Sequence, residues 1–366
     1  MCALTRSPSA KPLTICCRPR LSGMRATFVP IAQVLALLTL PACTAVAPVQ
    51  KKAVRFSNGD VTLAGSLFLP AGQGRHPAVV LFHGSGPQAR NESLGRWFAA
   101  QGVAALTYDK RGVGESNGDF RKVPFMDLCG DGLAAVGFLK ARDDIDPHRI
   151  GVWGLSQGGW LGPLAASQSR DVAFVIAVSG PGVSPGEQMV YYYGSQLRDQ
   201  GLSESGIAEA STLRRRVWQY LATGNDYAGA KAALAVAHSQ PWFAALRAQE
   251  DGLFAKSDSE ILDNSELRSH LWFRVELNYD PVQALHKLSV PALFLFGEQD
   301  ELVPVAKSVE VIRSVLSKDS NHDFTIKVFP GANHGLYVTA ADGARSYAPG
   351  YLDTMRDWMR AKAISR

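Results

Sequence analysis

Short, uninterrupted apolar runs recur along the chain and alternate with segments of helical periodicity. The apolar runs lie at 77–82, 103–108, 150–153, 174–178 and 292–296. Runs of this length are typical of strands that are buried on both faces of a parallel sheet. Helical periodicity lies between them, for example at 92–101 and 125–141. The pattern therefore predicts an α/β fold with a doubly wound, mostly parallel sheet.

The pattern changes at both ends of this alternation. Residues 54–70 predict an antiparallel hairpin, because Asn58-Gly59-Asp60 supplies residues that tolerate the positive φ of a tight turn. Residues 324–329 alternate as a last strand, and a closing helix is expected over about 344–362. The linker before the hairpin is expected at 44–53.

Residues 184–288 contain no buried-strand run. Helical runs lie at 187–200, 204–223, 227–238 and 266–276. This segment is predicted to be a helical cap inserted between a first core part, 54–183, and a second, 289–366. Its aromatic residues are expected mainly in its own core, with a minority touching substrate; they include Tyr191, Tyr192, Tyr193, Trp218, Trp242, Phe243, Trp272 and Phe273.

Residues 1–43 have the pattern of a targeting segment. A basic start at Met24-Arg25 precedes an uncharged apolar stretch, 28–40, which is too short for a membrane span but suits a signal peptide. Leu40-Pro41-Ala42-Cys43 resembles a bacterial lipobox, so we expect export, lipidation of Cys43 and attachment to the periplasmic face or the outer membrane. Cleavage after Ala47, an uncleaved anchor helix, and translation from Met24 instead of Met1 are alternatives.

The charge is concentrated in that same leader. The formal net charge is +5, yet residues 1–42 hold five basic and no acidic residues, so the rest of the chain is balanced. No basic stripe interleaved with aromatics follows, and nucleic acid is not an expected partner. A hydrophobic fraction of 46% supports a large core. Cys129 would be the last free cysteine of the processed chain, and its apolar neighbours favour a buried position.

The segment Gly154-Leu155-Ser156-Gln157-Gly158 has the spacing G-x-S-x-G, and it lies between an apolar strand and a helix-compatible run. A serine at such a corner adopts a strained backbone that lifts its hydroxyl clear of the sheet. Glycines two residues before and after are needed because side chains there would collide with neighbouring elements. Ser156 is therefore the candidate nucleophile; the alternative is a surface serine in a glycine-rich loop.

Two further residues follow predicted strands. Asp300 comes after the strand at 292–296, and His334 comes after the strand at 324–329. Open parallel sheets bind ligands at the carboxyl ends of their strands. A nucleophile, a base and an orienting acid are what acyl transfer requires, and the order Ser…Asp…His suits this kind of sheet.

Taken together, the motifs resemble the α/β-hydrolase superfamily from about residue 54 to 360, and within it the capped serine esterases close to the acyl-peptidase-like branch. The resemblance rests on segments 83–86, 109–116, 154–159, 297–300 and 331–335. It implies a catalytic triad of Ser156, His334 and Asp300. It also implies that the backbone N–H groups of Gln157 and Ser85 form the oxyanion hole, with Gly84 or Gly86 as alternative donors to Ser85.

Several residues compete for these roles. Glu298 and Glu301 are rival acids. His322 is the main rival base and is expected to be solvated, while His83 is expected to order the oxyanion loop. The remaining histidines show no strand-end context: His76, His148, His238, His270 and His286. Asp109 and Arg111 are expected to form a structural ion pair that pins a turn.

The resulting hypothesis is an exported serine hydrolase that cleaves carboxylic esters. A serine aminopeptidase or dipeptidyl-peptidase-like enzyme is the alternative, although the carboxylates of the insertion show no compelling cluster for a substrate terminus: Glu187, Glu204, Glu209, Glu276 and Asp280. A non-catalytic binding protein on a hydrolase fold is a third hypothesis. No zinc motif, P-loop or dinucleotide-binding segment is present in the sequence, so no cofactor or metal is expected. The expected partner is a small acyl ester or a short peptide.

Overall fold

The computed structural model describes residues 48–318 and 323–364, and these residues belong to one compact unit. The leader expected at 1–43, with Cys43, lies outside the described residues. Among the described helices, none is long and apolar enough to span a bilayer.

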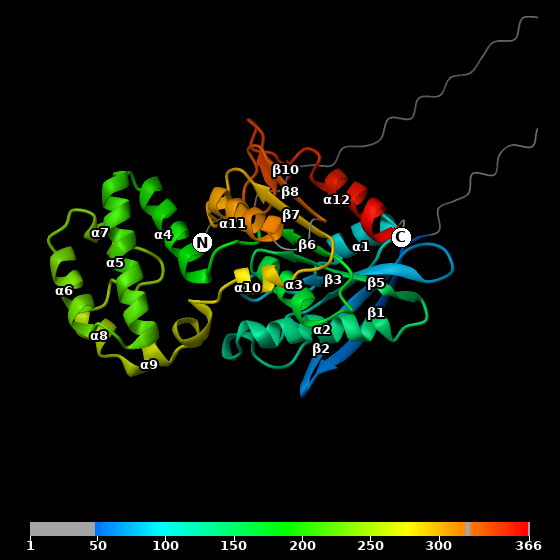
Figure 1. Cartoon of the computed structure of the whole chain (residues 1–366), viewed down its shortest axis with the longest axis horizontal. Helices are drawn as coiled ribbons and strands as arrows, with labels where there is room; N and C mark the ends of the chain where they lie inside the picture. The colour runs from blue at the N-terminus through cyan, green and yellow to red at the C-terminus, as the bar shows by residue number, and fades with distance from the viewer. Residues whose placement is uncertain (1–47, 319–322, 365–366) are drawn as a thin grey trace, which may run out of the picture. The chain divides into compact units, whose positions relative to one another are not determined.

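An eight-stranded sheet forms the centre of this unit (Figure 1). Its strands are β1 Gln50–Asn58, β2 Val61–Leu69, β3 His76–Phe82, β4 Ala104–Tyr108, β5 Ile145–Leu155, β6 Val175–Val178, β7 Ala292–Gly297 and β8 Phe324–Phe329. They lie in the order β1-β2-β4-β3-β5-β6-β7-β8, and all pairs from β4 to β8 are parallel. The predicted fold class is confirmed. The strand order reverses at β3, so a ligand site is expected at the carboxyl ends of β3 and β5.

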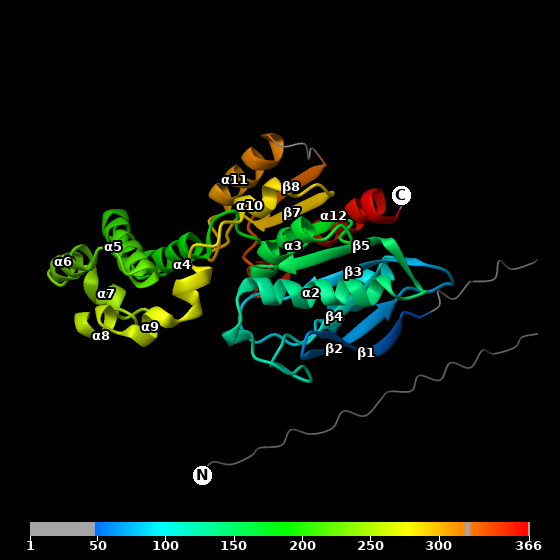
Figure 2. The same cartoon turned by 60° about the horizontal axis from the view of Figure 1, so that its bottom comes forward.

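Helices cover both faces of the sheet (Figure 2). One face packs against α2 Phe125–Lys140, α3 Gln157–Gln168, α10 Val282–His286 and α11 Val305–Lys318. The other packs against α1 Glu92–Ala100 and α12 Tyr351–Met359, followed by the π-helical turn η3 Arg360–Ile364. Because both faces are covered, the central strands are largely apolar, and every residue of β4, β6 and β7 is buried.

The chain between β6 and β7 is helical. Besides α10, its helices are α4 Pro185–Asp199, α5 Glu204–Thr223, α6 Tyr227–Ala237, α7 Phe243–Arg247, α8 Asp258–Leu262, α9 Ser265–Ser269 and the π-helical turn η2 Trp272–Glu276. Serine side chains cap α4 and α5 at Ser184 and Ser203, and Gly224 (φ 76°) ends α5 in the left-handed conformation. A separate hydrophobic cluster holds these helices together. We refer to residues 184–288 as the helical insertion.

Three expected elements differ in the structure. The prediction of a linker over 44–53 is wrong for its last residues, because β1 begins at Gln50, which pairs with Leu69 of β2. The closing helix begins at Tyr351, not near 344; a small hairpin, β9 Tyr337–Thr339 and β10 Arg345–Tyr347, occupies the preceding residues. The run expected at 266–276 is broken at His270 into α9 and η2. A further short element is the 3-10 turn η1, Phe120–Lys122.

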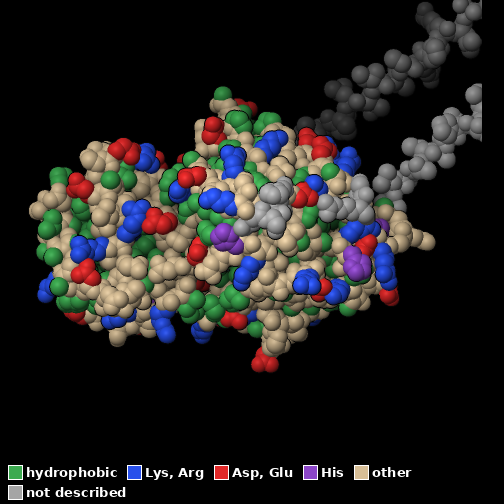
Figure 3. Space-filling view, in the orientation of Figure 1, with side chains coloured by type: hydrophobic (Ala, Val, Ile, Leu, Met, Phe, Trp, Pro, Cys, Tyr) green, Lys and Arg blue, Asp and Glu red, His purple; other side chains and the backbone are tan. Residues whose placement is uncertain are grey.

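Charged side chains are dispersed over the surface. On the face drawn in Figure 3, Lys and Arg lie beside Asp and Glu rather than in a patch of one sign. Within residues 48–318 and 323–364, no group of three His, Cys, Asp or Glu is placed to hold a metal ion. Cys129 is fully buried, as expected, and burial raises the pKa of its thiol to about 12.

Candidate active site

Ser156 lies at a sharp corner between β5 and α3. Its backbone has φ 57° and ψ −115°, a conformation that non-glycine residues rarely adopt. A Cβ on Gly154 would lie 2.1 Å from the carbonyl oxygen of Gly158, and one on Gly158 would lie 2.9 Å from that of Phe82. The G-x-S-x-G spacing is therefore required by close backbone contact. The Ser156 side chain makes no helix-capping hydrogen bond, so its hydroxyl is available for other contacts.

Asp300 and His334 lie in contact after β7 and β8. Asp300 Oδ2 and His334 Nδ1 are 2.8 Å apart. Asp300 Oδ1 accepts hydrogen bonds of 2.9 Å from the amides of Leu302 and Val303, and the carboxylate side chain is fully buried. Since both oxygens are occupied, the carboxylate is held in one orientation and fixes the imidazole that it contacts.

His334 is anchored beside the corner that carries Ser156. The Ser179 hydroxyl, at the end of β6, donates to the His334 carbonyl over 2.8 Å. The preceding residue, Val178, accepts a hydrogen bond of 2.9 Å from the Ser156 amide. Ser156 and His334 are thus attached to two consecutive residues of one strand end. The structure brings the three predicted residues to the carboxyl ends of β5, β7 and β8, at the same edge of the sheet.

The rival residues are placed elsewhere. Glu298 is exposed and accepts a hydrogen bond from the Gly331 amide, and Glu301 is exposed as well. The His238 side chain is exposed and contacts the carboxylate of Asp258. His322 lies outside the described residues. Asp300 is the acid that contacts His334, which agrees with the preference for it over Glu298.

The loop after β3 lies directly against the serine corner. A Cβ built on Gly84 would be 3.6 Å from Ser156 Cβ. The Gly84 amide donates to Gln88 Oε1 over 3.0 Å, and Gln88 Nε2 donates to the Ser85 carbonyl over 3.2 Å. Gly84 is therefore already engaged as a donor. Among the hydrogen bonds of the described residues, none uses the amides of Ser85 or Gln157 as donors.

His83 orders this loop, as expected. Its Nε2 lies 2.6 Å from the carbonyl oxygen of Tyr108, and its ring packs edge-on against the Tyr108 ring. Burial lowers the pKa of His83 to about 4. The imidazole is therefore neutral at pH 7 and donates from Nε2 to the carbonyl.

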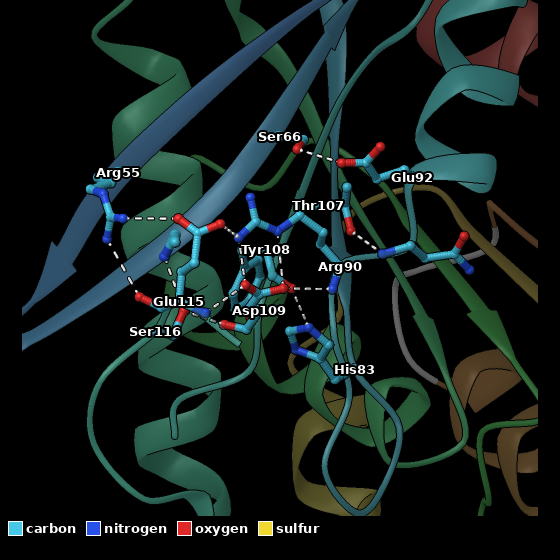
Figure 4. A network of polar contacts seen from close by, with 12 residues as sticks. Arg55, Ser66, His83, Arg90, Glu92, Thr107, Tyr108, Asp109, Glu115 and Ser116 are labelled. Carbon is cyan, nitrogen blue, oxygen red and sulfur yellow. Dashed lines mark hydrogen bonds and ion pairs between the residues drawn. The ribbon is translucent and has the colours of Figure 1, made fainter. Parts of the chain in front are cut away.

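The expected ion pair between Asp109 and Arg111 is wrong in its pairing. Asp109 binds the guanidinium of Arg90 instead, and Arg90 also reaches Glu115 (Figure 4). Arg111 pairs with the buried Asp131 of α2 through bonds of 2.6 and 2.7 Å. Both residues do have structural roles, but their partners come from elements that are distant in sequence. The Arg90 guanidinium holds the pKa of Asp109 at about 2.

Lys110, between these two residues, belongs to the site but was assigned no role from the sequence. It is 2% exposed, and its Nζ donates 2.8 Å hydrogen bonds to the Gly84 carbonyl and to Gln157 Oε1. Burial lowers its pKa to about 8. A lysine at a strand end within a polar motif was the available signal, but its contacts depend on β4 lying beside β3.

A cavity of about 650 Å³ opens at these loops and extends under the helical insertion. Ser85 and Gln157 line it at the sheet, and Met189 and Leu253 are among its apolar residues. Four of the eight aromatic residues singled out in the insertion also line it: Tyr193, Trp218, Trp272 and Phe273. Glu276 is a carboxylate on its wall, and burial raises the pKa of Glu276 to about 7.

The insertion also contacts the loop that carries the acid. Three side chains of α4 donate hydrogen bonds to consecutive carbonyls of this loop. Tyr191 donates to Asp300 over 3.2 Å, Ser195 to Glu301 over 2.9 Å, and Gln188 to Leu302. We call this contact the α4 clamp. No pattern in the sequence predicts this contact.

This sheet order, with helices on both faces and a serine corner after β5, defines an α/β hydrolase. The chain belongs to the family described as Serine aminopeptidase, S33, whose model matches residues 73–339. The protein is therefore a hydrolase.

Similar proteins agree with this assignment. An uncharacterized 31.7 kDa protein of Escherichia coli is 28% identical over 255 residues, 68% of this chain and 81% of that protein. Esterase EstD of Thermotoga maritima is 26% identical over 291 residues, 76% of this chain and 60% of EstD. The crystal structure of the α/β hydrolase GrgF from Penicillium sp. aligns with a TM-score of 0.54 at 20% identity, covering 86% of this chain and 99% of that one; this likeness concerns the fold alone.

Proposed function

We propose that this protein hydrolyses carboxylic esters through an acyl-enzyme on Ser156. The observation that carries the proposal is the buried Asp300–His334 hydrogen bond at the sheet edge that also holds the strained Ser156 corner. The likeness to EstD, an esterase, supports an ester substrate.

In this mechanism His334 takes the proton of the Ser156 hydroxyl as the oxygen attacks the acyl carbonyl. Asp300 keeps the proton of the imidazole on Nδ1, so that Nε2 is free to accept, and it stabilises the imidazolium that forms. The amides of Gln157 and Ser85 receive the developing oxyanion. His334 then protonates the leaving alcohol, and water repeats the cycle to release the acid.

The helical insertion would act as a cap that shapes the acyl pocket. The insertion contributes 14 of the 24 residues that line the cavity, and Phe125, Leu128 and Trp160 add apolar side chains from α2 and α3. Pockets that bind small ligands are usually apolar with a few placed polar groups, and this cavity has that character.

The test is hydrolysis of a panel of chromogenic acyl esters of rising chain length, beside aminoacyl anilides. Ser156→Ala should abolish ester turnover, while Ser167→Ala, near the other end of α3, should retain turnover with a folded protein, because the Ser167 hydroxyl contacts only the Leu164 carbonyl among the bonds described. Ester turnover that survives in Ser156→Ala would refute the nucleophile. Absence of any Ser156-dependent turnover would favour the binding-protein hypothesis.

An aminopeptidase is the second candidate, and one observation favours it. Glu276 places a carboxylate in the cavity, where it could bind the amino terminus of a peptide. The description of the matched family names the same activity. This alternative would be established if the wild type prefers aminoacyl anilides and if Glu276→Gln loses anilide turnover while it retains ester turnover.

We also propose export and lipidation at Cys43, on the resemblance of residues 40–43 to a lipobox. Cys43→Ser should release the protein from the membrane fraction of a bacterial expression host. Unchanged fractionation would refute the lipid anchor without bearing on catalysis.

A further inference from the structure

Lys110 connects the two loops that supply the proposed oxyanion donors. Its Nζ donates to the Gly84 carbonyl on the loop after β3 and to the Gln157 side chain at the start of α3, both over 2.8 Å. The ammonium also lies 5.0 Å from the centre of the Phe120 ring. A buried ammonium with these partners is held in one position, because its movement would leave the Gly84 carbonyl and Gln157 Oε1 buried without a hydrogen bond from Lys110.

The bond to Gly84 acts on one peptide group in particular. The carbonyl of Gly84 and the amide N–H of Ser85 belong to the same planar unit, and the described peptides are all trans. In a trans peptide the carbonyl and the N–H point in opposite directions. Holding the oxygen toward Lys110 therefore directs the Ser85 N–H away from it.

Gln88 completes the support of this peptide. It accepts from the Gly84 amide and donates to the Ser85 carbonyl, on either side of the peptide that Lys110 holds. Of the Gly84 and Ser85 backbone N–H and carbonyl groups, the Ser85 N–H is the one for which no hydrogen bond is described. The same ammonium holds the side chain of Gln157, whose backbone N–H is the second donor.

We propose that Lys110 is a positioning residue that sets both oxyanion donors from one buried ammonium. This inference rests on the proposed acyl-transfer function. The positive charge also polarises the Gly84–Ser85 peptide, which makes its N–H a stronger donor in the transition state. Lys110 is among the residues that line the cavity, but its proposed effect acts through the Gly84–Ser85 peptide and Gln157.

The charge state of Lys110 is set by groups from several elements. Glu276 of η2 and Asp131 of α2 favour the ammonium, while burial opposes it and lowers the pKa to about 8. Asp109 precedes it in the chain, and the neighbouring His83 is neutral. The ammonium is therefore present below pH 8; above it the amine keeps its N–H groups but loses its charge.

The experiment measures kcat and KM of purified protein on a chromogenic acyl ester from pH 6 to 10. Wild type, Lys110→Met, Lys110→Arg and Ser156→Ala are compared, with Lys140→Met as the matched control on the exposed end of α2. Removing one oxyanion donor costs about 10²–10³ in kcat. Loosening two donors without removing them should cost roughly 10–100-fold in kcat, with KM changed by less than about threefold.

The pH profile provides a readout that a merely structural lysine would not change. Wild-type kcat should fall above pH 8, and Lys110→Arg should restore most of the activity while moving this fall beyond pH 10. A Lys110→Met enzyme with wild-type kcat and an unchanged alkaline fall would overturn the inference. If Lys110→Met does not fold, an alkaline fall that is identical in wild type and Lys110→Arg overturns it. Full activity of Ser156→Ala would instead refute the proposed function itself.

Discussion

The substitution Asp300→Asn tests the proposed mechanism at its most defined contact. Asn matches Asp in shape, and its Oδ1 can still accept from the amides of Leu302 and Val303. Its Nδ2 would then occupy the place of Oδ2, which lies 2.8 Å from His334 Nδ1. Because Nδ2 is a donor, Nδ1 would have to accept, and the imidazole proton would move to Nε2.

The wrong tautomer cannot take the proton of the nucleophile, so the loss should be large. Replacing the triad aspartate by asparagine in a serine protease lowers kcat by about 10⁴. We expect a loss of 10³–10⁴ here, which corresponds to roughly 4–5.5 kcal/mol of transition-state stabilisation. KM should change little, because Asp300 is not among the residues that line the proposed acyl pocket.

The assay is steady-state ester hydrolysis at pH 7.5, with the melting temperature of each variant measured in parallel. Glu298→Gln is the matched control, since Glu298 is an exposed acid two residues earlier that contacts only the Gly331 amide among the bonds described. It should retain activity within about twofold, as expected for a surface substitution. A folded Asp300→Asn enzyme with near-normal kcat, or a larger loss in Glu298→Gln, would refute the reasoning.

Three further predictions concern the insertion and its cavity. Arg214→Met leaves Asp251 without its buried partner and should lower the free energy of unfolding by about 3 kcal/mol, or the melting temperature by roughly 5 °C. Arg215 is exposed, so Arg215→Met should change the free energy of unfolding by less than about 1 kcal/mol in the same denaturation assay. Burial raises the pKa of Glu276 to about 7, above its unfolded value, so the folded state loses stability as pH rises toward and through 7; Glu276→Gln should therefore raise the melting temperature more at pH 8 than at pH 5, and equal changes would contradict the assignment. Trp272→Ala enlarges the cavity and should shift the ester optimum toward longer acyl chains, measured as kcat/KM across the panel; an unchanged optimum would place Trp272 outside the acyl pocket.

The sequence was sufficient to predict those site residues that lie next to a recognisable local pattern. Buried parallel strands are largely apolar, so the end of β7 was visible, and Asp300 follows it. His334 follows β8, a partly exposed strand that was visible from its alternating pattern. The Ser156 corner was visible because close backbone contact requires glycine at 154 and 158. These signals are short-range and needed no knowledge of which strands are neighbours.

Features that depend on neighbours could not be inferred. Arg90 and Asp131 lie 19 and 20 residues from their partners, so the ion pairs of the 109–111 turn were assigned to the wrong residues. Lys110 acquires its role only because β4 lies beside β3. The β9–β10 hairpin was missed because its residues are largely exposed and carry no apolar alternation, and its presence delays the closing helix to Tyr351.

The α4 clamp has a consequence for transplanting the insertion between related enzymes. Side chains of α4 donate hydrogen bonds to the carbonyls of residues 300–302, so the helical insertion is tied directly to the loop that carries Asp300. A chimera that exchanges residues 184–288 to acquire another specificity would have to carry Gln188, Tyr191 and Ser195 or matching donors. Without them, we expect the exchanged insertion to leave the Asp300 loop less constrained, so that selectivity and turnover would change together.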